Sequence, residues 1–243
     1  MVTEIPGITV TVIRKRIKNI HLYVKPPDGR VEVTAPLRAV DSTIRAFVLE
    51  KADWIRRKQA EIAARPVPAE KQYLPGETLY VWGEPCILRL RTDARPVPPV
   101  YAGGEILLSV RPESTVKQRE ARVTEWYRDI LREEIDRRLP LWSGTTGLFP
   151  ASWHIRDMTS RWGSCNTRTG RICFNLQLAK RSPECLDYVI LHELAHLRVP
   201  NHGPRFTAIL DRYMPLWKEI RKKLNTPLPD MPDIQPGQCP DGE

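Results

Sequence analysis

Three histidines and one glutamate within a short stretch of the chain carry the clearest chemistry in the sequence. His192, Glu193 and His196 have the spacing His-Glu-x-x-His, and His202 follows six residues later. On a helix, residues four apart lie on one face, so His192 and His196 can both bind one zinc ion. Glu193 points about 100° away from them, where it can take a proton from zinc-bound water. We therefore predict that Glu193 is the general base of a hydrolytic site.

The third histidine follows a break in the helical pattern. Pro200 removes a backbone donor and keeps Val199 out of helical geometry, so the chain must turn there. A turned chain can bring His202 back to the metal. Three imidazoles and one water form the open coordination of a catalytic zinc site, whereas a structural site has four protein ligands. The sequence therefore predicts one catalytic Zn²⁺, bound by His192, His196 and His202.

The helix that must position this motif is largely apolar. An alternative interpretation is a surface helix whose histidines are simply solvated. The apolar residues occupy most of its circumference, which predicts burial, and a buried polar cluster needs partners such as a metal. These apolar residues are Leu186, Val189, Ile190, Leu194 and Leu197.

Composition indicates a soluble globular protein with a basic surface. The chain has 243 residues, of which 41% are hydrophobic and 28% charged. Lys and Arg outnumber Asp and Glu by 38 to 29, which gives a formal charge of +9. This balance attracts polyanions, so nucleic acid or a nucleotide is a candidate partner beside a peptide or protein substrate.

The sequence favours a cytoplasmic location. Its first residues lack the basic and apolar segments of a signal peptide, and no stretch approaches the length of a membrane span, so we expect no membrane partner. The five cysteines are an odd number without a Cys-x-x-Cys pair, which argues against a disulfide framework. Oligomeric state leaves no signal in the sequence.

The remaining patterns divide the chain into three parts. Residues 1–112 contain short alternating runs typical of strands, with one helix expected at about 42–63. Residues 113–225 begin with a long amphipathic helix and contain the metal motif. Residues 226–243 are rich in proline, glycine and acids, so we expect a poorly ordered tail.

A strand hairpin is expected at about 153–178, directly before the metal-binding helix. An edge strand beside the metal can hold an extended substrate by backbone hydrogen bonds. On or beside this hairpin, Arg161 and His154 are candidates for contacts with the substrate or with a developing oxyanion. The catalytic region is thus expected to combine a small sheet with helices, which predicts an α+β fold.

Three segments resemble the YgjP-like metallopeptidase family, which is related to the SprT-like and WLM zinc proteases. They are Trp54-Ile-Arg-Arg-Lys58, Arg161-Trp-Gly-Ser-Cys165 with Asn175 and Leu178, and Asp187 to Leu197 with Asn201, His202 and Phe206. The resemblance implies a zincin-like catalytic domain, in which the His-Glu-x-x-His helix packs on a small sheet after a β-rich amino-terminal region. It also implies that the three histidines bind zinc and that Glu193 is the base. By analogy with gluzincins, Glu219 is a second candidate for the third ligand.

The leading hypothesis is therefore a zinc-dependent metallopeptidase that hydrolyses peptide bonds with a zinc-activated water. Some YgjP-like members carry the name of a UTP pyrophosphatase, so a metal-dependent nucleoside triphosphate pyrophosphohydrolase is an alternative. The sequence shows neither a Walker loop nor a carboxylate cluster for magnesium, which favours peptide hydrolysis. A third alternative is a nucleic-acid-associated module with a structural or vestigial metal site.

Overall fold

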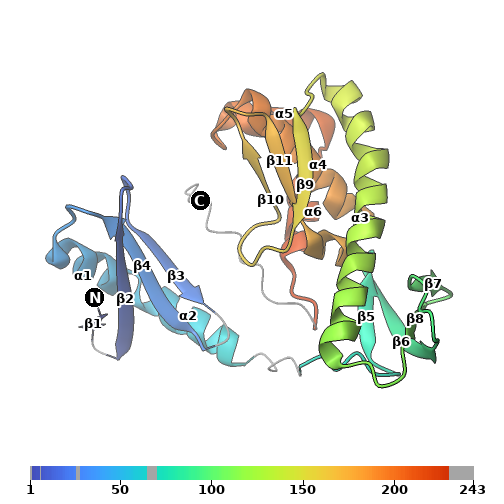
Figure 1. The fold of residues 1–243 in the computed structure, drawn as a ribbon. Coiled ribbons are helices and arrows are strands. Elements are labelled where there is room, and N and C mark those ends of the chain that lie inside the picture. The colour runs from blue at the N-terminus through green and yellow to red at the C-terminus, as the bar shows by residue number, and fades with distance from the viewer. Residues whose placement is uncertain (1, 6, 26–27, 65–69, 230–243) are drawn as a thin grey trace. The chain divides into compact units, whose positions relative to one another are not determined.

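The computed structural model describes residues 2–5, 7–25, 28–64 and 70–229, and the chain forms two compact units, residues 1–68 and 69–243. The amino-terminal unit has four strands followed by two helices (Figure 1). They are β1 (Val2–Ile5), β2 (Ile8–Lys15), β3 (His21–Lys25), β4 (Arg30–Pro36), α1 (Asp41–Glu50) and α2 (Ala52–Ala63).

The amino-terminal sheet has the strand order β1-β2-β4-β3, with β2 and β4 parallel and the other pairs antiparallel. Alternate strand residues are buried and pack against Ile44, Val48, Ile55 and Ile62 of the two helices. We predicted one helix at about 42–63, and the structure corrects this, because the helix is interrupted at Lys51. The sequence has neither glycine nor proline there, so no breaker indicated the interruption.

The second unit contains seven strands, four α-helices and one short 3-10 helix among the described residues. The first part comprises β5 (Thr78–Val81), β6 (Glu84–Thr92), β7 (Val100–Ala102), β8 (Glu105–Val110) and the long helix α3 (Val116–Thr146). The second part comprises β9 (Ser152–Arg156), β10 (Gly163–Asn166), β11 (Arg171–Asn175), η1 (Leu176–Lys180), α4 (Pro183–Arg198), α5 (Pro204–Tyr213) and α6 (Trp217–Asn225).

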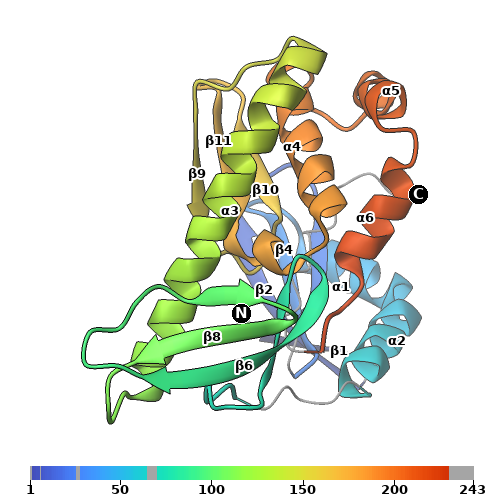
Figure 2. The ribbon, with the colours of Figure 1, turned by 90° about the vertical axis from the view of Figure 1, so that its right-hand side faces the viewer.

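Helix α3 extends along both sheets of this unit, with β5–β8 near its start and β9–β11 farther along (Figures 1 and 2). The sheets have the orders β5-β6-β8-β7 and β10-β11-β9. The hydroxyl of Tyr127 on α3 donates to the carbonyl of Tyr80 on β5, and residues of both sheets share one core with α3 and α4. The sheet at 78–110 therefore belongs to the same unit as residues 113–225, and the units divide at residue 68, whereas we predicted a division at 112.

The described residues form six α-helices and three small mixed sheets, which confirms the predicted α+β class. Within the described residues, no helix has the length and apolar character needed to cross a membrane. The four described cysteines are free thiols. Of the predicted tail, residues 230–243 lie outside the described residues. Thr226, just before them, accepts a hydrogen bond from Arg181 at 2.6 Å through its carbonyl.

Candidate metal centre

Helix α4 holds the first two histidines on one face. Pro183 occupies its first turn, where the missing backbone donor is harmless. Most of the following residues are buried, so the helix lies within the core rather than on the surface. The rings of His192 and His196, one turn apart, have centroids 4.8 Å apart. The interpretation as a solvated surface helix is therefore wrong.

His202 joins this pair because α4 ends just before it. The helix stops at Arg198, and Val199 is extended, with φ −131° and ψ 103°. The chain turns and begins α5 at Pro204, which leaves His202 in the connection. The Nε2 atom of His202 lies 3.1 Å from that of His192, and the Nε2 atom of His196 lies 3.2 Å from that of His192. The three imidazoles thus form a cluster that could hold a metal ion.

The distances and protonation states of this cluster fit a metal. In a tetrahedral zinc site with Zn–N bonds of about 2.0–2.1 Å, ligand nitrogens lie roughly 3.3 Å apart. Burial lowers the pKa of His192 well below its usual value and also lowers the pKa of His196. These imidazoles are therefore neutral at pH 7, and a neutral imidazole offers a lone pair to a metal.

Each of the two helical histidines has a partner for its other ring nitrogen. His196 Nδ1 lies 3.2 Å from the carbonyl oxygen of Val199, which requires a proton on Nδ1 and leaves Nε2 as the metal-facing atom. His192 Nδ1 lies 3.5 Å from the hydroxyl of Tyr188. The Tyr188 ring stacks on Trp217 with an interplanar angle of 3°. Tyr188 is thus a positioning residue, and we assigned it no role from the sequence.

Phe206 forms a common wall behind the three imidazoles. Its ring centroid lies 4.9 Å from that of His192 and 4.7 Å from those of His196 and His202. It is 1% exposed and begins the buried side of α5. In the sequence Phe206 is one of the residues that carry the family resemblance, but we assigned it no role at the metal, because an aromatic residue at an apolar helical position has the pattern of any core residue.

Glu193 has the surroundings of a reactive carboxylate. Its side chain is 4% exposed, and its Oε2 atom has no hydrogen-bond partner among the described residues. Burial raises its pKa to about 8, and the positive charge of Arg161 opposes that rise. A carboxyl group with a pKa near neutrality can both accept and release a proton.

Strand β10 packs against α4 close to Glu193. A Cβ atom added to Gly163, the first residue of β10, would lie 2.5 Å from Glu193 Oε1. Only glycine allows this approach of strand and carboxylate. On its other side β10 pairs with β11, and it is the outer strand of the sheet within the described residues. Its free edge can therefore accept an added strand.

The segment before β10 is held by one buried amide. Asn175 Nδ2 donates to the carbonyls of Met158 at 2.8 Å and Arg161 at 2.6 Å. Its Oδ1 accepts from the backbone N–H of Gln177 at 3.1 Å. Asn175 is fully buried, so these contacts fix the path of residues 158–161 toward Gly163. The structure thus gives a reason for the asparagine in the motif.

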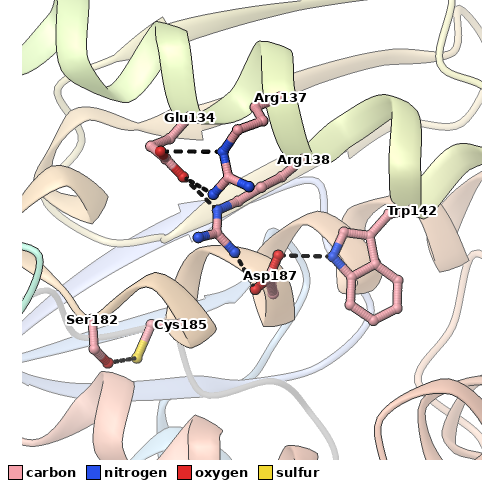
Figure 3. A network of polar contacts seen from close by, with 7 residues as sticks. All are labelled: Glu134, Arg137, Arg138, Trp142, Ser182, Cys185 and Asp187. Carbon is pink, nitrogen blue, oxygen red and sulfur yellow. Dashed lines mark hydrogen bonds and ion pairs between the residues drawn. The ribbon is translucent and has the colours of Figure 1, made fainter.

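Helix α4 is also held against α3 by polar contacts. Asp187 accepts hydrogen bonds from Arg138 and, at 2.8 Å, from the indole of Trp142 (Figure 3). Arg138 also pairs with Glu134, whose pKa is lowered by hydrogen bonds from Arg137 and Arg138. These contacts fix α4 at Asp187, the residue directly before Tyr188.

Two other predicted site residues lie elsewhere. His154 is exposed on β9, which is separated from β10 by β11, and it is not part of the histidine cluster. Glu219 is exposed on α6 and is also outside the cluster. Arg161 is exposed but close enough to Glu193 to lower its pKa. The structure therefore brings together Glu193, Arg161 and the histidine cluster.

Comparison with known proteins supplies a family and two solved structures. The family model described as YgjP-like, metallopeptidase domain, matches residues 18–227. The zymogen of the Pyrococcus abyssi metallopeptidase abylysin is 22% identical over 38% of this chain and 92% of its own, with a TM-score of 0.36. The zymogen of the Methanocaldococcus jannaschii metallopeptidase jannalysin is 25% identical over 37% and 92%, with a TM-score of 0.34. No curated protein matches the chain.

Proposed function

The chain belongs to the YgjP-like family of metallopeptidase domains, a family of metal-dependent proteases, and from this membership we propose that it is a zinc-dependent peptidase. The observation that carries the proposal is the convergence of three imidazole Nε2 atoms beside a buried carboxylate without a partner. The zinc ligands are His192, His196 and His202, and Glu193 is the general base.

Different groups orient the imidazoles of His192 and His196. His192 is oriented by Tyr188 and His196 by the carbonyl of Val199, so both present Nε2. When bound, zinc supplies a Lewis acid that polarises the scissile carbonyl and lowers the pKa of the attacking water to about 7. Phe206 keeps solvent away from the rear of the imidazoles, because its ring covers all three.

Glu193 moves the proton. Its buried Oε2 accepts the proton of the attacking water and then donates it to the leaving nitrogen of the peptide. A pKa near the operating pH suits this group, since the carboxyl must gain and lose one proton in each turnover. Gly163 leaves the space that this carboxylate occupies.

The polypeptide substrate adds as a strand to the free edge of β10. This edge begins at Gly163, beside Glu193, so a peptide paired with it passes the catalytic carboxylate. Arg161 lies two residues before this strand and places a positive charge near the reacting carbonyl. Within the Arg-Trp-Gly-Ser-Cys motif, Arg161 thus acts on the substrate and Gly163 leaves room for the base.

The test is the substitution Glu193→Gln, with Glu219→Gln as control. Glu193→Gln should retain one zinc per chain and reduce the rate of peptide hydrolysis by about a thousandfold, because the amide cannot accept the proton. Glu219→Gln should retain both zinc and activity. Peptide cleavage at the parent rate by Glu193→Gln would contradict the role of the base.

The same samples distinguish peptide hydrolysis from nucleotide hydrolysis. Parent protein is incubated with a mixture of denatured protein substrates and, separately, with UTP. Peptide fragments without pyrophosphate support the peptidase. Pyrophosphate release without peptide cleavage, lost in Glu193→Gln, would replace the peptidase by a nucleotide hydrolase at the same metal.

A further inference from the structure

A second polar site lies in the same unit as the metal centre. A pocket of about 680 Å³ is formed where the first half of α3 meets η1 and residues 70–73. None of its lining residues belongs to the histidine cluster, and Glu193 is not among them. Its volume is in the range of ligand-binding pockets, which is about 300–1,000 Å³.

Tyr73 is held in this pocket by a strained backbone. Its φ of 53° is in the left-handed region, which residues with a Cβ rarely adopt. Arg119 donates two hydrogen bonds, at 3.1 and 2.9 Å, to the carbonyl of Gln72. Glu77 Oε1 accepts from the backbone N–H groups of Gln72 and Leu74, at 3.1 and 3.0 Å. The contacts on both sides impose the conformation, and strain maintained in this way is typical of functional sites.

Gln177 lines the pocket and carries an unpaired acceptor. Its side chain is 7% exposed, and its Nε2 donates to Asp157 Oδ1 at 2.9 Å, which fixes the amide orientation. The Oε1 atom is buried and has no donor among the described residues. A buried amide oxygen without a donor is unfavourable, so a ligand that brings an N–H group would stabilise it.

The field around Tyr73 favours a positive charge. Burial, together with the negative charges of Glu120, Glu77 and Asp157, raises the pKa of Tyr73 to about 12. Glu120 and Asp157 both line the pocket. A cation at this position is attracted by the carboxylates, and the tyrosine rings offer it an aromatic face.

The lysines of the pocket have internal partners. Lys71 donates to the carbonyl of Thr78 at 2.7 Å. The Nζ atom of Lys180 lies 5.2 Å from the ring centre of Tyr127. The second contact shows that an aromatic wall of this pocket accepts a cation. Lys117 is exposed at the rim, on the solvent side of α3.

One short segment connects the pocket with the metal centre. Asp157 lines the pocket. Gly163, six residues later, lies directly beside the Glu193 carboxylate. Asn175 fixes the residues between them through the carbonyls of Met158 and Arg161. Six residues span at most about 20 Å, so one extended polypeptide can reach both places.

We propose that this pocket binds an arginine side chain of the polypeptide substrate, several residues from the cleaved bond. A guanidinium group has N–H donors that can form hydrogen bonds to Gln177 Oε1 and to the Asp157 carboxylate. Its flat face can stack on a tyrosine ring. The proposal rests on the proposed peptidase function for the nature of its ligand. It assigns the pocket a specificity role that the metal centre does not provide.

The first test measures binding without catalysis. The full chain with Glu193→Gln is titrated with acetyl-Gly-Gly-Arg-Gly-Gly amide and with the same peptide containing citrulline, which has the same shape without the charge. We expect at least tenfold tighter binding of the arginine peptide. The preference should fall below threefold in Glu120→Gln and in Gln177→Leu, but persist in Glu133→Gln, a matched change on the exposed side of α3. Equal binding of the two peptides, or an unchanged preference in Gln177→Leu, would overturn the proposal.

The second test separates the pocket from the peptidase activity. Parent protein is assayed on longer peptides in which one arginine is moved along a glycine- and alanine-rich sequence. An arginine at one distal position should raise kcat/KM at least tenfold, and Gln177→Leu should remove this gain without changing cleavage of the peptide that lacks arginine. If no peptide is cleaved, the peptidase proposal fails. The preference for the arginine peptide over the citrulline peptide then still tests whether the pocket binds arginine. Cleavage independent of arginine position would refute the pocket's role in specificity.

Discussion

The metal centre and the pocket beside α3 belong to the same unit, but their polar groups are held in different ways. In the metal centre, the imidazoles of His192 and His196 come from a buried helix, and each has a partner for its second nitrogen. In the pocket, Tyr73 lies on a strained segment, and Gln177 Oε1 has no donor. Both sites contain a buried oxygen without a donor among the described residues, Glu193 Oε2 in the first and Gln177 Oε1 in the second, but only the first brings three imidazoles together.

The two sites show how an expected metal ion and an expected organic ligand leave different signs in a structure. At the metal centre, three converging acceptor atoms would repel each other unless a cation lies between them. In the pocket, one buried acceptor and two carboxylates favour a donor with a positive charge. The predictions below test whether each group acts through the ligand or through the fold.

The largest effect is expected from His202→Ala. Structural zinc sites with four ligands bind with about 10–16 kcal/mol, so one ligand contributes roughly 3–4 kcal/mol, or about a hundredfold to a thousandfold in affinity. Competition with a chromogenic chelator measures the change. His154→Ala, on β9 outside the cluster, is the control and should bind zinc as the parent does. Full affinity in His202→Ala would place the third ligand elsewhere.

Asn175→Ala is expected to destabilise the second unit by about 3 kcal/mol. The substitution leaves the carbonyls of Met158 and Arg161 without their donor in a buried place. Urea unfolding of metal-free protein measures the effect, so that metal loss does not contribute. Asn166→Ala is the control, because that exposed amide accepts only within its own turn, and about 0.5 kcal/mol is expected. Similar losses in both variants would argue against a special role for Asn175.

Gly163→Ala should reduce peptide hydrolysis by about a hundredfold while zinc is retained. The added Cβ would meet the Glu193 carboxylate at 2.5 Å, so the base must move from its place, and misplaced catalytic groups lose about this factor. Steady-state kinetics and metal content are measured together. Gly144→Ala, in α3 with open space around it, should leave kcat/KM unchanged. A loss of zinc in Gly163→Ala would show that the strand supports the ligands rather than the base.

The histidine cluster could be predicted from the sequence because its members are close along the chain. His192, His196 and His202 span eleven residues, and the helical period alone brings the first two together. Phe206 could not be assigned its role, because an aromatic residue at an apolar helical position has the pattern of any core residue. The contact of the Phe206 ring with all three imidazoles follows only from the packing of α5 on α4, which the sequence does not reveal.

The pocket could not be predicted because its lining comes from four distant segments. Tyr73, Glu120, Asp157 and Gln177 meet only after the sheet of β5–β8 has packed against α3. The sequence has prolines at 66 and 68, but packing against α3 decides that the sheet at 78–110 belongs after the division at residue 68. The sequence predicted helices, strands and the α+β class, since these depend on local periodicity.

Tyr188→Phe is expected to weaken zinc binding by about tenfold, the lower limit for the loss of a group that orients a metal ligand. The ring still stacks on Trp217, so the free energy of unfolding of the metal-free protein should stay within about 0.5 kcal/mol of the parent. The hydroxyl that faces His192 Nδ1 is the only group removed. Tyr101→Phe, on the distant strand β7, is the control for loss of a hydroxyl. If both variants bind zinc equally well, Tyr188 serves packing alone.

Gln177→Leu should have the smallest effect on stability, although its amide is almost as deeply buried as that of Asn175. The change removes one hydrogen bond, to the exposed Asp157, together with an oxygen that has no donor. Replacing an unsatisfied buried polar group by an apolar group of similar shape is nearly neutral, so we expect a change within about 0.5 kcal/mol. Urea unfolding of Gln177→Leu and Asn175→Ala, side by side, compares the free energy of unfolding lost at each of these two amides. A loss comparable to that of Asn175→Ala would mean that Gln177 is needed for the fold, and the unpaired oxygen would then no longer indicate a ligand.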